Sequence, residues 1–416
     1  MLKKAAVLGL FATALASVGF AQEGPVPKGV PHLDHVFVIM MENHGYSQIV
    51  DNPNAPFINE YIKKVNIGTN YFAVAHPSLT NYLEVTGGSN FGVLNDNSPS
   101  WDDPTCVTNL STGKPSLDDG TYPAICPIRG TGTDAATPLI DYSNETSPPA
   151  ITAVTEIDGV HSYPAASGIV GKTIADQLEE AGKTWKSYQE DLPSTGAHLV
   201  NYSDGFFTNS SNIAAILPQQ SPTPTTGNIV QLYAVKHDPF AYFQSIQEKG
   251  LGNIVGFEGP HGLFDDLSSG RVPHYSYIVP NQCNDQHGKN NGTLACYGDP
   301  NDDGTQNGLN PALIYQGDLT LRTLVKAIHD SPAWQEGNNA IVVVWDENDY
   351  SSAPYPNKVL FTVDTNYGSK RVKSDRYYTH FSLLRTVEAG LHLPCLNHAC
   401  DSSTAVISDL FGRGDE

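Results

Sequence analysis

The sequence predicts an α/β fold of three layers, in which helices cover both faces of a mostly parallel central sheet. Two observations support this. Five short apolar runs, rich in β-branched residues, are typical of strands buried on both faces; they span 35–41, 253–257, 275–279, 340–345 and 359–363. Helical patterns lie between them, and alternating strands and helices favour a parallel or mixed sheet covered on both sides.

Six segments carry the helical patterns. In one, Leu79, Tyr82 and Leu83 share a face, and the pattern stops at Gly87 and Gly88. The other five segments are 57–64, 171–181, 239–248, 319–329 and 381–389.

Three long segments break this rhythm, and they are rich in Ser, Thr, Pro, Gly, Asn and Asp. They span 91–163, 201–228 and 283–311. Long loops in a compact domain are usually functional covers or disordered. Two of the three contain cysteine pairs, so we expect ordered lid loops.

The chain begins with a positive start and a short apolar run. Lys3 and Lys4 precede the run, which ends in small residues at Ala21. This pattern is typical of a secretory signal peptide spanning 1–21. We expect a secreted or periplasmic protein without a stable membrane anchor, in which 22–416 form a single domain.

The chain is strongly acidic. Its formal net charge is −21, and it becomes −23 when Lys3 and Lys4 leave with the leader. Such a surface repels nucleic acid and anionic membranes at long range. An anionic substrate must therefore be attracted locally, by a metal ion or by fixed dipoles.

An even number of cysteines in an exported chain predicts disulfides. The sequence contains six, and neighbours along the chain are the preferred partners among fifteen possible connectivities. The preferred pairs are Cys106 with Cys126, Cys283 with Cys296, and Cys395 with Cys400.

Polar residues follow three of the predicted strands. Glu42-Asn43 follow 35–41, Asp346-Glu347 follow 340–345, and Asp285 and His287 come shortly after 275–279. Ligands of open α/β sheets bind beyond the carboxyl ends of the strands. Oxygen donors from separate strand ends can converge on one divalent cation, although strand-end carboxylates can also cap helices or face solvent.

Ser78 and His380 each stand at the start of a predicted helix. A serine at this position is usually a helix cap, but a helix amino terminus also attracts phosphate. A nearby metal would make the Ser78 hydroxyl a nucleophile. His380 is either an ordinary helix-end histidine or a group that supports the metal site.

Seven motifs together resemble the phosphoesterase family of acid phosphatases and non-specific phospholipases C, which has an alkaline-phosphatase-like fold. No single motif is decisive, but they occur in the family's order across most of the chain. They are Met41-Glu42-Asn43; His76-Pro77-Ser78 with Asn81-Tyr82; Tyr188 through Glu190 to Pro193; Lys236-His237-Asp238-Pro239-Phe240; Pro280-Asn281 through Asn284-Asp285 to His287; Trp345-Asp346-Glu347; and Thr379 through His380 to Arg385.

The resemblance implies a role for each matching residue. The expected metal ligands are Glu42, Asn43, Ser78, Asp346 and Glu347. The expected catalytic residues are Ser78 as nucleophile, Asn81 on the phosphoryl oxygens, Asp285 and His287 near the leaving group, and His380. His287 is the best candidate for general acid. Glu190 and His237 match the family without a defined role.

The sequence departs from the family at two places. Thr80 stands where a proline is common, and Asn348-Asp349-Tyr350-Ser351 replace a glycine-containing stretch that leads to an aspartate-histidine pair. The resemblance therefore implies one divalent metal and leaves a second one open. A separate stretch with Asp299, Asn301 and Asp303 resembles the start of a calcium loop, but its twelfth position is Asn310 instead of Glu.

The function predicted from these features is a secreted metal-dependent phosphoesterase of the acid-phosphatase type. It would hydrolyse small phosphate monoesters through a phosphoserine intermediate. A phospholipase C acting on phosphodiesters is the first alternative, and a non-catalytic secreted metal-binding protein is the second. The sequence leaves the oligomeric state open.

Overall fold

The computed structural model describes residues 23–91, 96, 107–108, 125–126, 169, 171–192, 233–288, 296–300, 305–348 and 357–412. The predicted signal peptide (1–21), Cys106, Asn301 and Asp303 lie outside these residues. So do most of the predicted lid segments 91–163 and 201–228.

An eight-stranded sheet forms the centre of the molecule. Its order is β11 (Lys373–Ser374), β2 (Asn66–Gly68), β10 (Phe361–Thr365), β9 (Asn339–Trp345), β1 (His35–Met41), β8 (Tyr275–Val279), β6 (Trp185–Gln189) and β7 (Ile254–Val255). The five strands from β9 to β7 run parallel to one another, and β10 is antiparallel to both of its neighbours. The prediction of a mostly parallel sheet is confirmed.

Two short pairs of parallel strands lie outside the main sheet. One joins β3 (Tyr71–Phe72) to β12 (Tyr378–Thr379), and the other joins β4 (Val107–Thr108) to β5 (Ile125–Cys126). The first pair places the segment before Ser78 beside the segment before His380.

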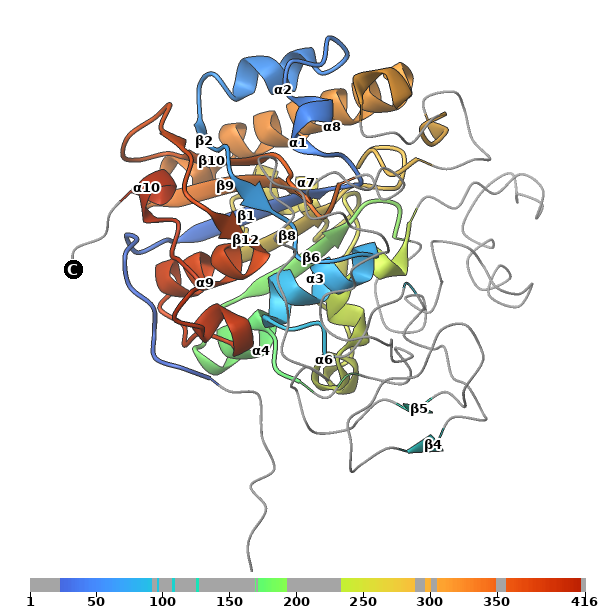
Figure 1. Cartoon of the computed structure of the whole chain (residues 1–416). Helices are drawn as coiled ribbons and strands as arrows, with labels where there is room; N and C mark the ends of the chain where they lie inside the picture. The colour runs from blue at the N-terminus through green and yellow to red at the C-terminus, as the bar shows by residue number, and fades with distance from the viewer. Residues whose placement is uncertain are drawn as a thin grey trace, which may run out of the picture.

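Helices cover both faces of the sheet (Figure 1). One layer contains α1 (Tyr46–Ile49), α2 (Pro56–Tyr61), α7 (Leu263–Ser269) and α8 (Pro311–Asp330). The opposite layer contains α3 (Ser78–Gly87), α4 (Ile174–Glu180), α6 (Gln244–Lys249) and α9 (His380–Gly390). The short α10 (Ser408–Phe411) packs beside β2, β10 and β11. This is the predicted three-layer α/β/α arrangement.

The central strand β1 shows why an apolar run predicts a strand here. Val36 through Met41 are all fully buried, because parallel neighbours flank the strand and helices cover both faces. Burial on both faces requires a continuous apolar sequence instead of an alternating one. The observed bounds of β1 and β8 match the predicted ones.

Strand β6 is missing from the sequence-based prediction. Its sequence WKSYQ contains polar residues, yet Ser187, Tyr188 and Gln189 are buried. Ser187 donates a hydrogen bond to Asp238 at 2.9 Å, and Tyr188 donates one to Asp266 at 2.7 Å. These partners are distant in sequence, so local polarity hides the strand.

The predicted helix 239–248 is two elements. A 3-10 helix, Pro239–Tyr242, is followed by α6, and Phe243 between them is extended. The Tyr242 carbonyl accepts a hydrogen bond from Ile169 N, and Phe243 forms a bridge with Ile169. A tertiary backbone pairing therefore interrupts the helical pattern.

Two of the three predicted disulfides are present. Cys283 is bonded to Cys296, and Cys395 to Cys400. The pairing of Cys106 with Cys126 stays a prediction, because Cys106 lies outside the described residues.

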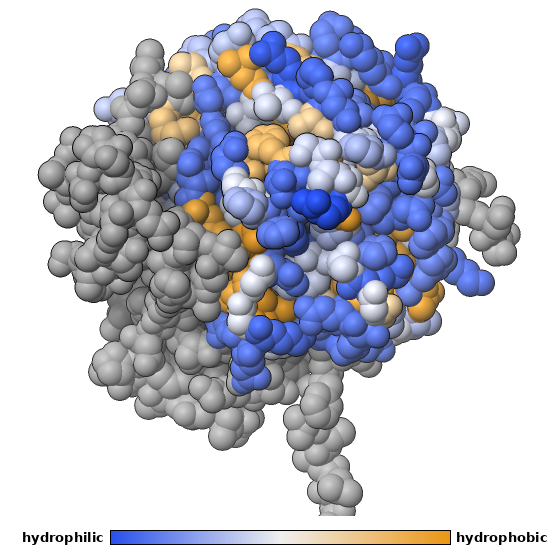
Figure 2. Space-filling view, turned by 180° about the vertical axis from the view of Figure 1, so that it is seen from behind, coloured by the Kyte–Doolittle hydropathy of each residue, from blue (hydrophilic) through white to orange (hydrophobic). Residues whose placement is uncertain are grey.

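Hydrophilic residues cover most of the described surface on the rear face of the molecule (Figure 2). Apolar residues there form separate patches. The exposed large hydrophobic side chains among the described residues are Val26, Tyr297, Tyr315 and Tyr377. No helix in this part of the chain combines the length and the hydrophobicity needed to cross a bilayer.

A matched pair of valine substitutions tests the burial of β1. Val38 is fully buried, whereas Val26 is 43% exposed. Val38→Ala should lower the free energy of unfolding by about 2 kcal/mol, because two methyl groups leave a packed core. Val26→Ala should change it by less than about 0.5 kcal/mol. Denaturant titration measures both, and equal effects would contradict the assigned core.

Candidate active site

The sheet register brings the first two pairs of site residues together. Met41 lies opposite Trp345 in the parallel ladder, so Glu42 and Asp346 leave the sheet side by side. Asp346 N donates to the Met41 carbonyl at 2.9 Å, and Asn43 N donates to Asp346 Oδ1 at 3.1 Å. Asn43 has a φ of 53°, in the left-handed region that asparagine tolerates better than most residues. The predicted convergence of these two strand ends is present.

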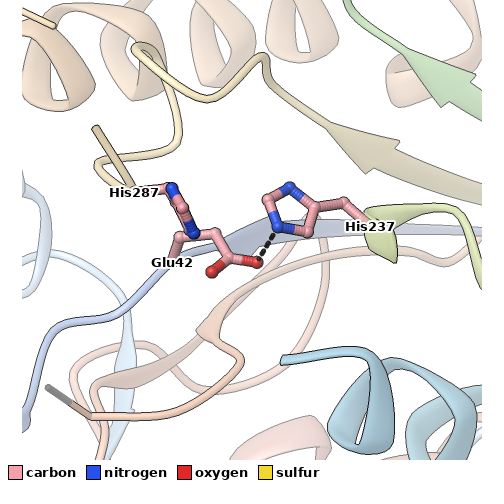
Figure 3. A group of neighbouring side chains, drawn as sticks. All are labelled: Glu42, His237 and His287. Atoms are coloured by element: carbon pink, nitrogen blue, oxygen red, sulfur yellow. Dashed lines mark ion pairs between the residues drawn. The ribbon is translucent and has the colours of Figure 1, made fainter. Parts of the chain in front are cut away.

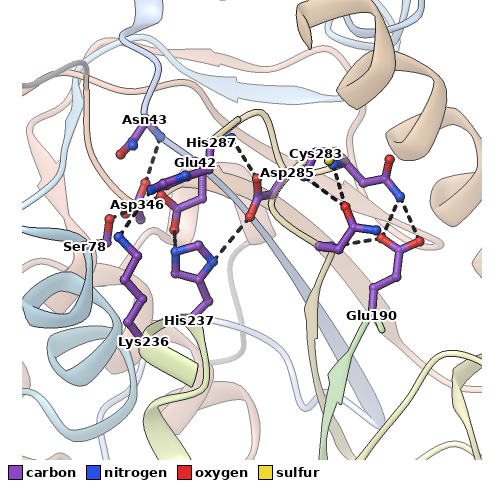
Figure 4. A network of polar contacts seen from close by, with 12 residues as sticks. Glu42, Asn43, Ser78, Glu190, Lys236, His237, Cys283, Asp285, His287 and Asp346 are labelled. Carbon is purple, nitrogen blue, oxygen red and sulfur yellow. Dashed lines mark hydrogen bonds and ion pairs between the residues drawn. The ribbon is translucent and has the colours of Figure 1, made fainter. Parts of the chain in front are cut away.

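The third strand end joins them through the loop after β8. Glu42 N donates to the Asp285 carbonyl at 2.9 Å. His287 N donates to Asp285 Oδ1 at 2.7 Å. Glu42, Asp285 and Asp346 are each fully buried. Three strand ends thus place three carboxyl groups in one small region of the interior (Figure 4).

Ser78 points its hydroxyl at two carboxylates. Ser78 is the first residue of α3, and its Oγ lies 3.2 Å from Glu42 Oε2 and 3.3 Å from Glu347 Oε1. The terminal amide of Asn43 faces the same two oxygens, with one atom 3.2 Å from each. We call Glu42, Asn43, Ser78 and Glu347 the oxygen cluster; Figure 4 shows the first three.

The donor set of the oxygen cluster fits a divalent cation. One oxygen each of Glu42 and Glu347 meets the Ser78 hydroxyl and the Asn43 amide there. With its nitrogen toward the carboxylates, the Asn43 amide donates to both of them. With its oxygen toward them, the amide would add a further oxygen ligand, and Mg²⁺, Ca²⁺ and Mn²⁺ bind carboxylate and amide oxygens.

The titration of the buried carboxyl groups agrees with this fit. Burial, followed by the charges of Asp346 and Asp285, raises the pKa of Glu42 well above its usual value. Burial is also the largest cause that raises the pKa values of Asp285 and Asp346. Buried carboxylates at such spacing must share protons or a positive ion to remain in the folded state.

His237 lies between two of these carboxyl groups, those of Glu42 and Asp285 (Figure 4), and Figure 3 shows its contact with Glu42. Its Nε2 lies 3.0 Å from Glu42 Oε1, and its Nδ1 lies 3.3 Å from Asp285 Oδ2. Tyr82 stacks on the imidazole at 5.2 Å and donates its hydroxyl to Glu42 Oε1 at 2.5 Å. Both oxygens of the Glu42 carboxylate therefore have fixed neighbours, with Ser78 on one side and His237 and Tyr82 on the other.

His287 faces the cluster and a lysine. The ligand atoms of Glu42, His237 and His287 all lie within 4.8 Å of one another. His287 Nδ1 donates to the Gly288 carbonyl at 2.9 Å, which leaves Nε2 3.2 Å from Lys236 Nζ. Nε2 of His287 therefore faces the site, and the role of His287 as general acid stays a prediction.

Glu190 supports the loop that carries Asp285. Its carboxylate accepts from Asn281 N at 2.9 Å and from Asn284 Nδ2 at 2.8 Å. Burial raises the pKa of Glu190, and the hydrogen bonds from Asn281 and Asn284 oppose this. The contacts give this family-matched residue a positioning task.

Asn81 is hydrogen-bonded to the main chain and to Glu347, and its expected contact with the phosphoryl oxygens stays a prediction. Its Oδ1 accepts from Val74 N and Ala75 N, both at 3.0 Å. Its Nδ2 donates to the Ala75 carbonyl at 2.8 Å and to Glu347 Oε2 at 3.0 Å. All four hydrogen-bonding positions of this amide are therefore occupied, and Asn81 fixes Glu347 beside Ser78.

His380 lies behind the oxygen cluster. Its Nε2 donates to the Asp346 carbonyl at 2.6 Å, and its Nδ1 accepts from the Tyr71 hydroxyl at 3.0 Å. Burial lowers the pKa of His380 to about 4, so it is neutral at physiological pH. The histidine holds the main chain of Asp346, which agrees with the supporting role considered from the sequence.

Asp299, the first residue of the predicted calcium loop, contacts His44 and Asn310. Its Oδ2 lies 2.9 Å from His44 Nε2, and its Oδ1 accepts from Asn310 N at 2.7 Å. His44 Nδ1 in turn donates to the Glu42 carbonyl at 2.9 Å. The calcium hypothesis loses support at Asp299, and its other two ligands, Asn301 and Asp303, lie outside the described residues.

Sequence reasoning gave no site role to Tyr82 or Lys236. Tyr82 was assigned to an apolar helix face, but its hydroxyl reaches Glu42. The available signal was spacing, because Ser78, Asn81 and Tyr82 stand at i, i+3 and i+4 on one face of α3. No local sequence pattern indicated a role for Lys236, because its partners Asp96 and His287 are distant from it in sequence.

Comparison with known proteins identifies similar sequences. A family model described as "Phosphoesterase family" matches residues 48–297, more than half of the chain. Glu42, Asn43, Asp346 and Glu347 lie outside the matched segment, while Ser78 lies inside it.

Individual relatives extend the similarity over most of the chain. A phosphatidylinositol-3-phosphatase of Mycobacterium tuberculosis is 22% identical over 411 residues, covering 98% of this chain and 93% of that protein. An acid phosphatase of Aspergillus fumigatus is 21% identical over 365 residues, covering 86% of this chain. The match spans 55% of the fungal protein's length.

A solved structure from Vibrio parahaemolyticus, a protein in the alkaline phosphatase superfamily, is also similar. It is 14% identical with a TM-score of 0.41, and the match covers 91% of this chain and 71% of that one.

The raised carboxyl pKa values predict how metal removal affects stability. Glu42, Asp285 and Asp346 bind protons in the folded chain at pH values where the unfolded chain has released them. Without metal, the melting temperature should therefore fall as pH rises from about 4, the unfolded pKa, through the raised folded values. A cation at 100 times its Kd should add about 2.7 kcal/mol of stability.

Thermal unfolding in a chelator and in Mg²⁺ or Mn²⁺, from pH 4 to pH 8, measures both effects. Glu42→Gln is the matched variant, because it removes one of the coupled carboxyl groups and should flatten the pH dependence in the chelator. A melting temperature that is insensitive to every divalent cation at neutral pH would contradict the metal site.

Proposed function

Because the chain belongs to the Phosphoesterase family and is a hydrolase acting on phosphoric ester bonds, we propose that it is a metal-dependent phosphomonoesterase with Ser78 as nucleophile. One observation carries the proposal. The Ser78 hydroxyl lies within 3.3 Å of carboxylate oxygens from two different strand ends, Glu42 and Glu347.

Ser78 has what a nucleophile needs. Its position at the amino terminus of α3 offers backbone N–H groups and positive potential to an incoming phosphoryl group. Its proton has a route out, because the hydroxyl donates to the Glu42 and Glu347 carboxylates. Attack of Oγ on phosphorus forms the Ser78 O–P bond while the bond to the substrate alcohol breaks, which yields a phosphoserine.

The oxygen cluster and Asp346 are the proposed metal ligands. A divalent cation held there would lower the pKa of the Ser78 hydroxyl and offset the negative charge of the phosphoryl oxygens. Asn81 keeps Glu347 in place, and His380 keeps the Asp346 main chain in place. The chain thus fixes the ligands through neighbours that are themselves buried.

His287 is the proposed proton donor to the leaving alcohol. Asp285 holds its backbone N–H at 2.7 Å, and the Gly288 carbonyl fixes Nδ1, so Nε2 faces the site. Donation from Nε2 requires the imidazolium form of His287, with a proton on both ring nitrogens, because Nδ1 keeps its own proton on the Gly288 carbonyl. Such proton transfer to the leaving oxygen contributes typically a hundredfold to ten-thousandfold in rate. In the second step the neutral imidazole would accept a proton from the water that cleaves the phosphoserine, releasing inorganic phosphate and restoring Ser78.

Phosphate monoesters are the proposed substrates. Two of the similar proteins are named as phosphatases, one for phosphatidylinositol 3-phosphate and one as an acid phosphatase. The strongly acidic chain favours a small phosphorylated substrate over nucleic acid. A signal peptide at 1–21 and a secreted or periplasmic location belong to the same proposal.

Two alternatives from the sequence stand differently. Because the chain belongs to a family of hydrolases, the alternative of a non-catalytic metal-binding protein is excluded. A phospholipase C remains an enzyme of the same family that would use the same nucleophile on a diester, so substrate assays separate it from the monoesterase.

Ser78→Ala should abolish turnover. The variant lacks the oxygen that attacks phosphorus, so kcat for para-nitrophenyl phosphate should fall at least about a thousandfold. Ser268→Ala is the control, because Ser268 is exposed and its hydroxyl donates to the Asp265 carbonyl within α7, outside the site. Substantial activity in a folded Ser78→Ala variant would sink the nucleophile assignment.

Monoesters should be preferred over diesters. We expect kcat/KM for para-nitrophenyl phosphate to exceed that for bis-para-nitrophenyl phosphate and for phosphatidylcholine by at least about tenfold, because a diester places an extra alcohol group where a charged oxygen is held. The reverse preference would identify the phospholipase C alternative.

A further inference from the structure

The side chain of Asp96 lies beside the residue that follows Ser78, the proposed nucleophile. Asp96 Oδ1 accepts a hydrogen bond from Leu79 N at 3.1 Å, and Asp96 Oδ2 lies 2.8 Å from Lys236 Nζ. Leu79 directly follows Ser78 in the first turn of α3. The carboxylate thus bridges the amino terminus of this helix and a buried ammonium group.

The partners of Asp96 are those expected for a phosphoryl group. The first N–H groups of a helix have no partner within the helix, and they attract anions. Lys236 is only 5% exposed, and its ammonium also lies 3.2 Å from His287 Nε2, the proposed proton donor. The Leu79 N–H and the Lys236 ammonium therefore converge on one carboxylate, next to the nucleophile in sequence and next to the proposed proton donor in space.

Charge balance explains why this place holds an anion. Lys236 also lies near Glu42 and Asp285, whose pKa values its charge lowers. Of these three carboxylates near Lys236, only that of Asp96 is partly accessible to solvent. Its side chain is 25% exposed, whereas Glu42 and Asp285 are fully buried. Asp96 is therefore the anion that can leave when a substrate anion arrives.

We propose that Leu79 N–H and Lys236 form the pocket for the non-bridging phosphoryl oxygens, and that the Asp96 carboxylate occupies this pocket as a built-in competitor in the free enzyme. The inference rests on the proposed function, because it assigns the phosphoryl site next to Ser78. Asp96 acts on binding, since it must withdraw before phosphate can contact Leu79 and Lys236.

The size of the effect follows from competition. A ligand that binds only the open fraction of a protein has its apparent Kd raised by the inverse of that fraction. If Asp96 closes the pocket for most of the time, its removal tightens phosphate binding by at least about threefold. A purely structural Asp96 would give the opposite sign, because loss of the bridge would leave Lys236 less well placed.

Direct binding of inorganic phosphate, measured by isothermal titration calorimetry in Mg²⁺ or Mn²⁺, tests the inference independently of turnover. Asp96→Asn and Asp96→Ala should lower the Kd of phosphate at least about threefold. Lys236→Met should raise it, and adding Asp96→Asn to Lys236→Met should give no gain. Asp330→Asn, which breaks an exposed ion pair with Lys326 on α8, is the matched control and should leave the Kd unchanged.

Unchanged or weaker phosphate binding in Asp96→Asn would overturn the inference. This variant decides even if Asp96→Ala loses its fold, because asparagine has nearly the same size as aspartate but no charge to hold it against the Lys236 ammonium. Steady-state kinetics separates this outcome from failure of the proposed function: KM and the Ki of phosphate should fall in Asp96→Asn. If the wild-type enzyme is active and Asp96→Asn changes neither constant, the competitor role of Asp96 is refuted and the proposed function stands. If Ser78→Ala turns substrate over, only the assignment of Ser78 as nucleophile is refuted.

Discussion

Repulsion among three buried carboxyl groups is the constraint on which the site depends. Glu42, Asp285 and Asp346 come from three strand ends, and none is exposed. Burial disfavours each charge, and neighbouring charges disfavour it further, which raises the pKa values of all three. The folded chain can hold them together only with shared protons or a positive ion, so the feature that costs stability in the free protein is the one that selects a cation.

Hydrogen bonds from surrounding elements hold these charged groups in place. Asn81 fixes Glu347, His380 fixes the Asp346 main chain, and Glu190 fixes the turn before Asp285. Each of these three supporting residues is buried or partly buried, and each comes from a different part of the fold. A site held in this way pays little reorganisation when substrate binds, because its polar groups already point toward their final positions.

This chain is strongly acidic, yet it must attract an anionic substrate. Its formal net charge is −21, so long-range electrostatics oppose a phosphate ester. The attraction has to be local, and three local sources meet at Ser78: the proposed cation, the amino terminus of α3 and the ammonium of Lys236. Asp96 keeps the last two occupied in the free protein, which links phosphate binding to the release of one carboxylate.

From the linear sequence we could predict the α/β class, the strands β1 and β8 and the strand-end residues Glu42 and Asp346, because apolar runs and the polar residues after them are local features. Two disulfide pairings could also be predicted, since their cysteines are neighbours along the chain. The remaining features depend on contacts between distant segments. Strand β6 needs buried partners distant in sequence, and the contacts of Asn81, Lys236 and Asp96 join segments that only the folded sheet brings together. Which partner a polar side chain bonds depends on its neighbours in three dimensions, and a linear pattern does not contain them.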